Sequence, residues 1–166
     1  MSFHLATRKI IKEWTDYNEH MNMAYYILIF DQAWETMLNK FQMGGENAKS
    51  NLRSTMVVET RTTYNNEVKE NQEVEVYCTH FDHDKKRLHL KCEMYEKETK
   101  TLAATMESLS LYIDLGKRKV TEFEEDKLKI MGEFINENKS SFKSENLELS
   151  GSCLLYTSPS PRDTSS

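Results

Sequence analysis

The sequence predicts an α+β fold in which a five-stranded antiparallel sheet wraps around one central helix, with a second helix nearer the C-terminus. Residues 23–41 carry apolar side chains at helical spacing, on a stripe so wide that other elements have to cover it. After residue 53 the pattern changes to an alternation of apolar and polar side chains, which is typical of strands. Short polar turns separate these strands and predict antiparallel neighbours.

The first strand is predicted at residues 3–13, and the long helix follows it. Asn22 is expected to cap this helix, because a short side-chain oxygen accepts hydrogen bonds from amides left free in the first turn. Apolar positions continue at helical spacing from Met23 to Phe41, and the Gly-Gly pair that follows is expected to end the helix. Residues 46–53 are predicted to be a polar connection.

Four strands come next, joined by three short polar connections. The strands are predicted at residues 54–65, 73–81, 87–95 and 101–114. Connections this short predict an antiparallel meander in which each strand pairs with the next one. In the first of these strands, one face is expected to carry Met56, Val58, Thr60, Thr62 and Tyr64.

The C-terminal part of the chain is predicted to contain one helix and a tail. Thr121 and Glu124 have the spacing of a capping box, which predicts a helix that runs to about Asn138. We expect residues 1–140 to form a single domain and residues 141–166 to be a disordered tail. Residues 154–166 resemble a translated adapter sequence, and we interpret them as a non-native artefact.

Length and charge exclude several classes of protein. A chain of 166 residues is long enough to bury a real core. The formal net charge of −5 argues against nucleic acid as a partner, because phosphate binding needs a concentrated basic face. No apolar stretch is long enough to span a membrane, because Asp31 and Glu35 interrupt the best candidate. The N-terminus has no secretory pattern, so we expect a cytoplasmic protein without membrane contacts.

A polar cluster stands directly before the long helix. Asp16, Asn18 and His20 alternate, so in an extended or turning segment their carboxylate, amide and imidazole can converge on one point. Such a set can orient a water molecule, remove its proton and position a carbonyl group. The free amides of the helix N-terminus can polarise that carbonyl. The alternative is purely structural, because Asp and Asn are also the favoured residues of turns and caps.

Glu59 lies in the middle of a predicted strand and shares its face with Arg61. It can be a solvated outer-face residue paired with Arg61, or a second acid that faces a cleft. We favour the first interpretation from the pattern alone.

Histidine and basic residues gather around the predicted turn at residues 82–86. His80, His83 and His89 lie near this turn and suggest a metal site, but their number and spacing are loose, so we favour a polar hairpin turn and expect no metal. Lys86 and Arg87 can contact phosphates of an anionic ligand, or form a solvated turn.

Aromatic side chains gather around the polar cluster. Trp14 and Tyr17 flank it, and Tyr25 lies in the first turn of the predicted helix. Aromatic residues at helical spacing usually belong to the core, but Trp14 and Tyr17 can also contribute to a cage for a cationic group.

The order of elements and the segment DYNEHMNMAYY resemble the hotdog-fold acyl-CoA thioesterases of the thioesterase-like superfamily, from about residue 3 to residue 123. The family pattern is met at Asp16, Asn18, His20, Met21 and Asn22. One departure is Glu19, where related sequences often carry a small residue such as Gly. A closer likeness, to the betainyl-CoA thioesterases of carnitine breakdown, rests on EWTDYNEHMNMAYYILIFDQA, VVETRTTYNNEV and HDKKRLHLKCEMYEKET.

This resemblance implies a role for each residue of the polar cluster. Asp16 is implied as the catalytic carboxylate, either a general base on water or a direct nucleophile. Asn18 and His20 are implied to orient the water or the thioester. Amides from Asn22 to Ala24 are implied to stabilise the developing oxyanion.

The resemblance also implies partners and an assembly. The substrate is an acyl-CoA, and no separate cofactor is implied, since coenzyme A is part of the substrate. A homodimer or a dimer of dimers is implied, with sites between protomers, so that Glu59 of a facing subunit lines the cleft. Lys86 and Arg87 become candidate contacts for the nucleotide of CoA. For a betainyl group, Trp14 or Tyr17 supplies an aromatic face, and Glu59 or Glu19 supplies the opposite charge.

Two other functions compete with hydrolysis. Hydratases and dehydratases of the same fold also use Asp and His, but they usually have one more residue between the Asn and the His than Asn18-Glu19-His20 has here. A non-catalytic acyl-CoA-binding module belongs to a different class, and it requires no proton transfer by Asp16.

Overall fold

The computed structural model describes residues 2–143 and 147–149. Its strands lie at Phe3–Lys9 (β1), Arg53–Tyr64 (β2), Glu73–His83 (β3), Arg87–Glu96 (β4), Leu102–Asp114 (β5) and Lys119–Val120 (β6). Its helices lie at Met23–Lys40 (α1), Gly45–Asn51 (α2) and Glu125–Asn138 (α3), with single 3-10 turns at Lys12–Trp14 and Lys139–Ser141. In the ranges described, no helix combines the length and the apolar character needed to cross a membrane.

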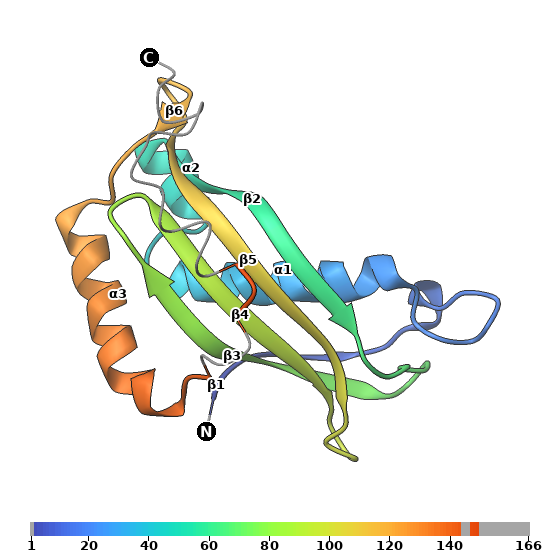
Figure 1. Ribbon diagram of the computed structural model, residues 1–166. Coiled ribbons are helices and arrows are strands. Elements are labelled where there is room, and N and C mark those ends of the chain that lie inside the picture. The colour runs from blue at the N-terminus through green and yellow to red at the C-terminus, as the bar shows by residue number, and fades with distance from the viewer. Residues whose placement is uncertain (1, 144–146, 150–166) are drawn as a thin grey trace.

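The main strands form one sheet in the order β1-β3-β4-β5-β2, and every neighbouring pair is antiparallel. The sheet curves around α1, and α3 lies beside it (Figure 1). The predicted α+β class, the five-stranded sheet around a central helix and the C-terminal helix are therefore confirmed. The short strand β6, which pairs with the end of β5, was not predicted.

Helix α1 provides most of the apolar surface that the sheet covers. Its cap is the predicted one, since the Asn22 side chain accepts a hydrogen bond from the Ala24 amide at 3.0 Å. Its buried side chains are Tyr26, Ile29, Phe30, Ala33, Trp34, Met37 and Leu38. Burial of each large apolar side chain stabilises the fold by about 1.5–3 kcal/mol, so this stripe fixes the helix against the sheet.

The predicted meander is wrong at its first connection. β2 pairs with β5 at one edge of the sheet and does not pair with β3. The connection between β2 and β3 passes the end of β5, where the amides of Asn65 and Asn66 donate to the Ala103 carbonyl at 2.8 and 3.2 Å. Further along this connection, Val68 is fully buried and anchors it in the core. A polar connection of this length can therefore cross the sheet, although its composition is that of a simple turn.

The residues predicted as a polar connection before β2 form helix α2. Asn47 is buried in this helix, and its side-chain amide donates to the Arg53 carbonyl at 3.2 Å and to the Tyr112 hydroxyl at 3.3 Å. These tertiary hydrogen bonds hold a polar seven-residue segment that has no apolar period of its own.

Two predicted boundaries are also wrong. β1 ends at Lys9 because the following residues turn into a 3-10 segment. Helix α3 begins with Glu124 as its N-cap, three residues after the predicted cap Thr121. The Glu124 carboxylate accepts a hydrogen bond from the Tyr112 hydroxyl at 2.6 Å, so it does not complete a capping box.

A β-bulge at Val58 changes the faces of β2. Met56 is paired with Leu111 and Thr62 with Met106, and these two β5 residues lie on opposite faces of the sheet. The register shifts between Val57 and Glu59. The prediction that Met56 shares a face with the threonines of β2 is therefore wrong, because one extra residue reverses the alternation.

The outer face of the sheet carries a buried carboxylate. Glu107 is 2 % exposed, and its oxygens accept hydrogen bonds from the His89 ring at 2.6 Å and from the amides of Glu148 and Leu149 at 2.7 and 2.8 Å. Lys143 pairs with Glu93 at 2.9 Å on the same face.

Part of the predicted disordered tail is thus packed against the sheet. Residues 141–143 and 147–149 make contacts that hold them there, because the backbone amides find acceptors on the sheet. Residues 144–146 and 150–166, with the proposed artefact at 154–166, lie outside the described residues.

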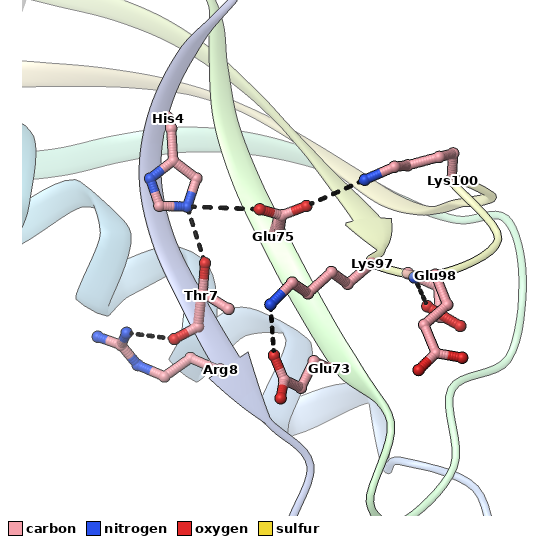
Figure 2. Close-up of polar contacts among 9 residues, drawn as sticks. His4, Thr7, Arg8, Glu73, Glu75, Lys97, Glu98 and Lys100 are labelled. Carbon is pink, nitrogen blue, oxygen red and sulfur yellow. Dashed lines mark hydrogen bonds and ion pairs between the residues drawn. The ribbon is translucent and has the colours of Figure 1, made fainter.

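Charged side chains surround the β1 edge of the sheet (Figure 2). Glu75 lies between His4 and Lys100, with nitrogen–oxygen distances of 4.0 and 3.6 Å. Lys97 pairs with Glu73 at 3.2 Å. Charges of this kind prevent an edge from pairing with another chain.

The buried Glu107 generates a stability prediction. Burial raises the pKa of Glu107, but the Glu148 amide, the His89 ring and the Leu149 amide outweigh burial, so its pKa lies below the ordinary value. Glu107→Ala should lower the free energy of unfolding at pH 7 by about 3 kcal/mol or more, because His89 and two amides lose their acceptor. Urea denaturation would measure this loss.

The lowered pKa of Glu107 also makes its contribution to stability depend on pH. A carboxylate with a lowered folded pKa stabilises the fold above its unfolded pKa of about 4.3, and this stabilisation disappears as the pH falls through the folded value. The difference between wild type and Glu107→Ala should therefore shrink below about pH 4. Glu133→Ala, at an exposed position of α3, is the control and should change stability by less than about 0.5 kcal/mol. Equal losses in both variants would contradict the prediction.

Candidate active site

The polar cluster before α1 forms a tight turn. The Glu19 amide donates to the Asp16 carbonyl at 2.9 Å, and the Asp16 amide donates to the His20 carbonyl at 3.0 Å. The Asn18 amide donates to Oδ1 of Asp16 at 2.9 Å. One carboxylate oxygen therefore orders the turn, and the other has no hydrogen-bond partner among residues 2–143 and 147–149. Asp16 can therefore order the turn with one oxygen and act as a base or nucleophile with the other, so the two interpretations of this residue are compatible.

Glu19 occupies the position of this turn that disfavours most side chains. Its φ is +66°, in the left-handed region that glycine adopts without a steric cost. This conformation explains why a small residue suits the position in related sequences. The Glu19 side chain is exposed, so its charge lies at the surface of the turn.

The turn is docked on the connection between β2 and β3. The Met21 amide donates to the Val68 carbonyl at 2.7 Å, and His20 forms an isolated β-bridge with Lys69. Nε2 of His20 lies 2.9 Å from Oε2 of Glu67, a residue that the sequence did not single out. Glu67 stands in a short polar connection, and no spacing pattern in the sequence links it to His20.

The helix N-terminus offers fewer amides than predicted. The Asn22 amide donates to the Trp14 carbonyl at 2.9 Å, and the Ala24 amide donates to the Asn22 side chain. Of the three amides from Asn22 to Ala24, only the Met23 amide has no acceptor within the described part of the chain. The Met23 amide is therefore the candidate donor to an oxyanion.

The predicted aromatic residues have different environments. The rings of Trp14 and Tyr25 stack with centroids 5.9 Å apart and an interplanar angle of 17°. Tyr17 is 94 % exposed, so it is not packed against this stack. Trp14 and Tyr25 thus form one partly buried aromatic wall beside the turn. Tyr17 is not part of this wall within one chain.

Glu59 is not brought to this turn. It is paired with Leu109 across β2 and β5, and residues directly opposite each other share a face of the sheet. Leu109 packs against Leu149 on the outer face of the sheet. Glu59 therefore also lies on the outer face, on the side away from α1. This position does not support a role for Glu59 beside Asp16 within one chain.

The basic pair also lies elsewhere. Residues 84–87 follow the end of β3, whereas the Asp16 turn is docked next to the connection that precedes β3 (Figure 1). Eleven residues of strand separate the two places by roughly 33 Å. Arg87 pairs with Asp84 at 2.8 Å, and the Lys86 carbonyl accepts from the Tyr112 amide. A role of Lys86 and Arg87 in nucleotide binding stays a prediction.

The histidines near that turn serve other contacts. His89 bonds to Glu107, the His83 ring lies 2.8 Å from the Asp84 carbonyl, and the His80 ring packs against Phe142. No group of three or more His, Cys, Asp or Glu side chains within the described ranges has the arrangement of a metal site.

The chain matches known proteins over most of its length. The family described as the thioesterase-like superfamily matches residues 11–131. A betainyl-CoA thioesterase from Pseudomonas aeruginosa is 30 % identical over 115 residues, which cover 69 % of this chain and 72 % of the relative.

Solved structures share the fold. A Staphylococcus aureus protein in complex with CoA superposes with a TM-score of 0.76 at 22 % identity, over 89 % of this chain and 90 % of its own. A 1,4-dihydroxy-2-naphthoyl-CoA thioesterase from Synechocystis superposes with a TM-score of 0.70 at 16 % identity, over 80 % of this chain and 96 % of its own. The sheet wrapped around α1 is therefore the fold seen in structures of this kind.

Proposed function

Because the chain belongs to the thioesterase-like superfamily, we propose that it is a hotdog-fold thioester hydrolase that converts an acyl-CoA to the free acid and coenzyme A. The observation that carries this proposal is the turn that holds Asp16, Asn18 and His20 together at the N-terminus of α1. No separate cofactor is needed, because water is the second reactant and CoA is part of the substrate.

The turn can supply each function that hydrolysis needs. The free oxygen of Asp16 removes a proton from water, whose oxygen then attacks the thioester carbonyl; alternatively, the carboxylate attacks first and water hydrolyses the resulting anhydride. The Met23 amide, at the positive end of α1, stabilises the oxyanion. Collapse of the tetrahedral intermediate breaks the carbon–sulfur bond, and the CoA thiolate takes up a proton. Both routes for Asp16 are compatible with this geometry.

A betainyl group is the acyl group that we propose. The support is the Pseudomonas aeruginosa relative, which is a betainyl-CoA thioesterase, together with the aromatic wall of Trp14 and Tyr25 beside the turn. An aromatic face attracts a trimethylammonium group by about 2 kcal/mol when the site is desolvated. Glu19 carries a negative charge on the same turn and can add to this attraction.

A homodimer that pairs along β2 is the assembly that we propose, with a dimer of dimers as the larger alternative. β2 is an edge strand with no buried residue, and Met56, Val57, Val58 and Tyr64 are 38–48 % exposed. A long apolar edge is a template for pairing with another chain. The opposite edge, at β1, carries charges instead (Figure 2).

Such a pairing bears on Glu59. Pairing along an edge continues the sheet and keeps every side chain on its own face. Glu59 therefore stays on the outer face in this dimer, and its predicted place in a shared cleft gains no support from the β2 edge.

The first prediction of the proposed function concerns Asp16. Asp16→Asn should reduce thiol release from acyl-CoA by roughly 100-fold or more, because the base or nucleophile is lost. Release would be followed with a thiol-reactive chromophore on betainyl-, acetyl-, medium-chain, long-chain and aromatic acyl-CoAs. Asp31→Asn, at an exposed position of α1, is the matched control and should keep wild-type activity. Unchanged release in Asp16→Asn would exclude the proposed role, and hydration of an enoyl-CoA without release would indicate a hydratase.

The second prediction concerns the acyl group. Trp14→Leu removes one face of the aromatic wall, so kcat/KM for betainyl-CoA should fall roughly 30-fold further than kcat/KM for a neutral acyl-CoA of similar size, which corresponds to about 2 kcal/mol. The neutral substrate serves as the internal control. Equal losses on both substrates would show that Trp14 does not recognise the cation.

The third prediction concerns the assembly. Val57→Lys should convert the dimer to a monomer, because two copies of the new charge would meet near the pairing axis. Light scattering coupled to size-exclusion chromatography measures the mass. Ile11→Lys, which replaces an exposed apolar residue outside β2, should leave the mass unchanged. A wild-type chain that runs as a monomer would contradict the proposal.

A further inference from the structure

We propose that Glu67 is a positioning residue: it holds the His20 imidazole through Nε2–H and leaves Nδ1 as the ring nitrogen that meets the reacting water. This inference rests on the proposed hydrolysis at the Asp16 turn. It assigns a task to a residue outside the Asp-x-Asn-x-His segment, which the resemblance to the family does not include.

The contact itself is short. Nε2 of His20 lies 2.9 Å from Oε2 of Glu67, an ion-pair distance that is also short enough for a hydrogen bond from Nε2–H once the exposed carboxylate turns into line with the ring N–H. No described residue forms a hydrogen bond with Nδ1 of His20. In a neutral imidazole one nitrogen donates and the other accepts. A carboxylate on Nε2 selects the tautomer with the proton on Nε2, so Nδ1 keeps its lone pair.

The backbones on both sides of this contact are fixed by other bonds. His20 and Lys69 form a β-bridge, and the Met21 amide donates to the Val68 carbonyl at 2.7 Å. Val68 is fully buried and anchors the connection that carries Glu67. Glu67 and His20 are therefore brought together by the fold, and only their side-chain rotamers remain to be ordered.

A second residue, in α1, is affected by the Glu67 carboxylate. The pKa of Tyr26 is raised, chiefly by burial and in smaller part by the negative charge of Glu67. The Tyr26 hydroxyl donates to the Asn66 carbonyl at 3.4 Å, and its ring contacts the Tyr64 ring edge-on at 5.3 Å. Glu67 thus contacts the His20 ring, and its charge also acts on Tyr26 in the first turn of α1.

The chemistry gives this arrangement a use. With Nδ1 as an acceptor, His20 can hold one hydrogen of the attacking water while Asp16 takes the other. A ring free to exchange its tautomers or to rotate would lose this orientation for part of the time. The carboxylate acts through His20 and touches neither the water nor the thioester, so its role is to position.

If the ion pair had a purely structural role, removal of Glu67 would lower stability and turnover together. Side-chain exposures are 29 % for His20 and 68 % for Glu67, and exposed pairs of this kind add little to stability. Removal of Glu67 should therefore leave the midpoint of urea unfolding unchanged while the chemistry slows. This separation of stability from turnover distinguishes the two roles.

The kinetic test uses five variants of the full chain, one of them a double variant. Glu67→Ala should lower kcat for acyl-CoA hydrolysis roughly 10- to 100-fold with little change in KM, the range found for carboxylates that orient metal-ligating histidines. Glu67→Gln keeps an oxygen acceptor for Nε2–H and should retain most of the activity. In a His20→Gln background, Glu67→Ala should cause no further loss, because the two residues act as a unit. Glu70→Ala removes an exposed carboxylate from the same connection and is the control.

A second readout does not depend on turnover. Nitrogen-15 NMR of the His20 ring should show the Nε2-protonated tautomer in the wild type and in Glu67→Gln, and a mixture in Glu67→Ala. If wild type releases thiol and Asp16→Asn abolishes release, but Glu67→Ala matches wild type, this inference is overturned and the proposed function stands. If wild type releases no thiol, the proposed function fails, and the NMR result still decides whether Glu67 sets the tautomer.

Discussion

The burial of one apolar helix is the constraint on which the rest of the structure depends. Helix α1 carries a wide apolar stripe, and the sheet has to curve in order to cover it. The curved sheet fixes both ends of α1, so the turn before the helix is held at a defined place. The hydrogen-bonded cap at Asn22 then aligns this turn with the helix axis. The position of this candidate catalytic turn in front of a rigid helix is thus a consequence of core packing.

The two edges of the sheet follow different physical rules. Near β1, ion pairs surround the edge, and charges oppose pairing with another chain (Figure 2). At β2, apolar side chains stay exposed along an edge strand of twelve residues. A bulge at Val58 reverses the faces of that strand half-way along. The β1 edge therefore opposes pairing with another chain, and the β2 edge is the one on which the proposed dimer rests.

The crossing connection between β2 and β3 links the sheet to the candidate site. Because β2 pairs with β5, this connection has to pass the sheet end and reach the turn that carries His20. Val68 anchors it, and Glu67 is presented to the imidazole as a result. A connection that looks like a simple polar turn in the sequence thus supplies a neighbour of the site.

Local pattern alone determined the α+β class, the bounds of α1, the Asn22 cap and the polar character of the turn before α1, because helical period, strand alternation and side-chain chemistry are properties of contiguous residues. Only the tertiary structure decided the partner of β2, the helical state of α2, the outer-face position of Glu59 and the contact between His20 and Glu67. Each of these depends on hydrogen bonds or register between segments far apart in the chain. One bulged residue or one crossing connection changes such a relation and leaves the local pattern unaltered.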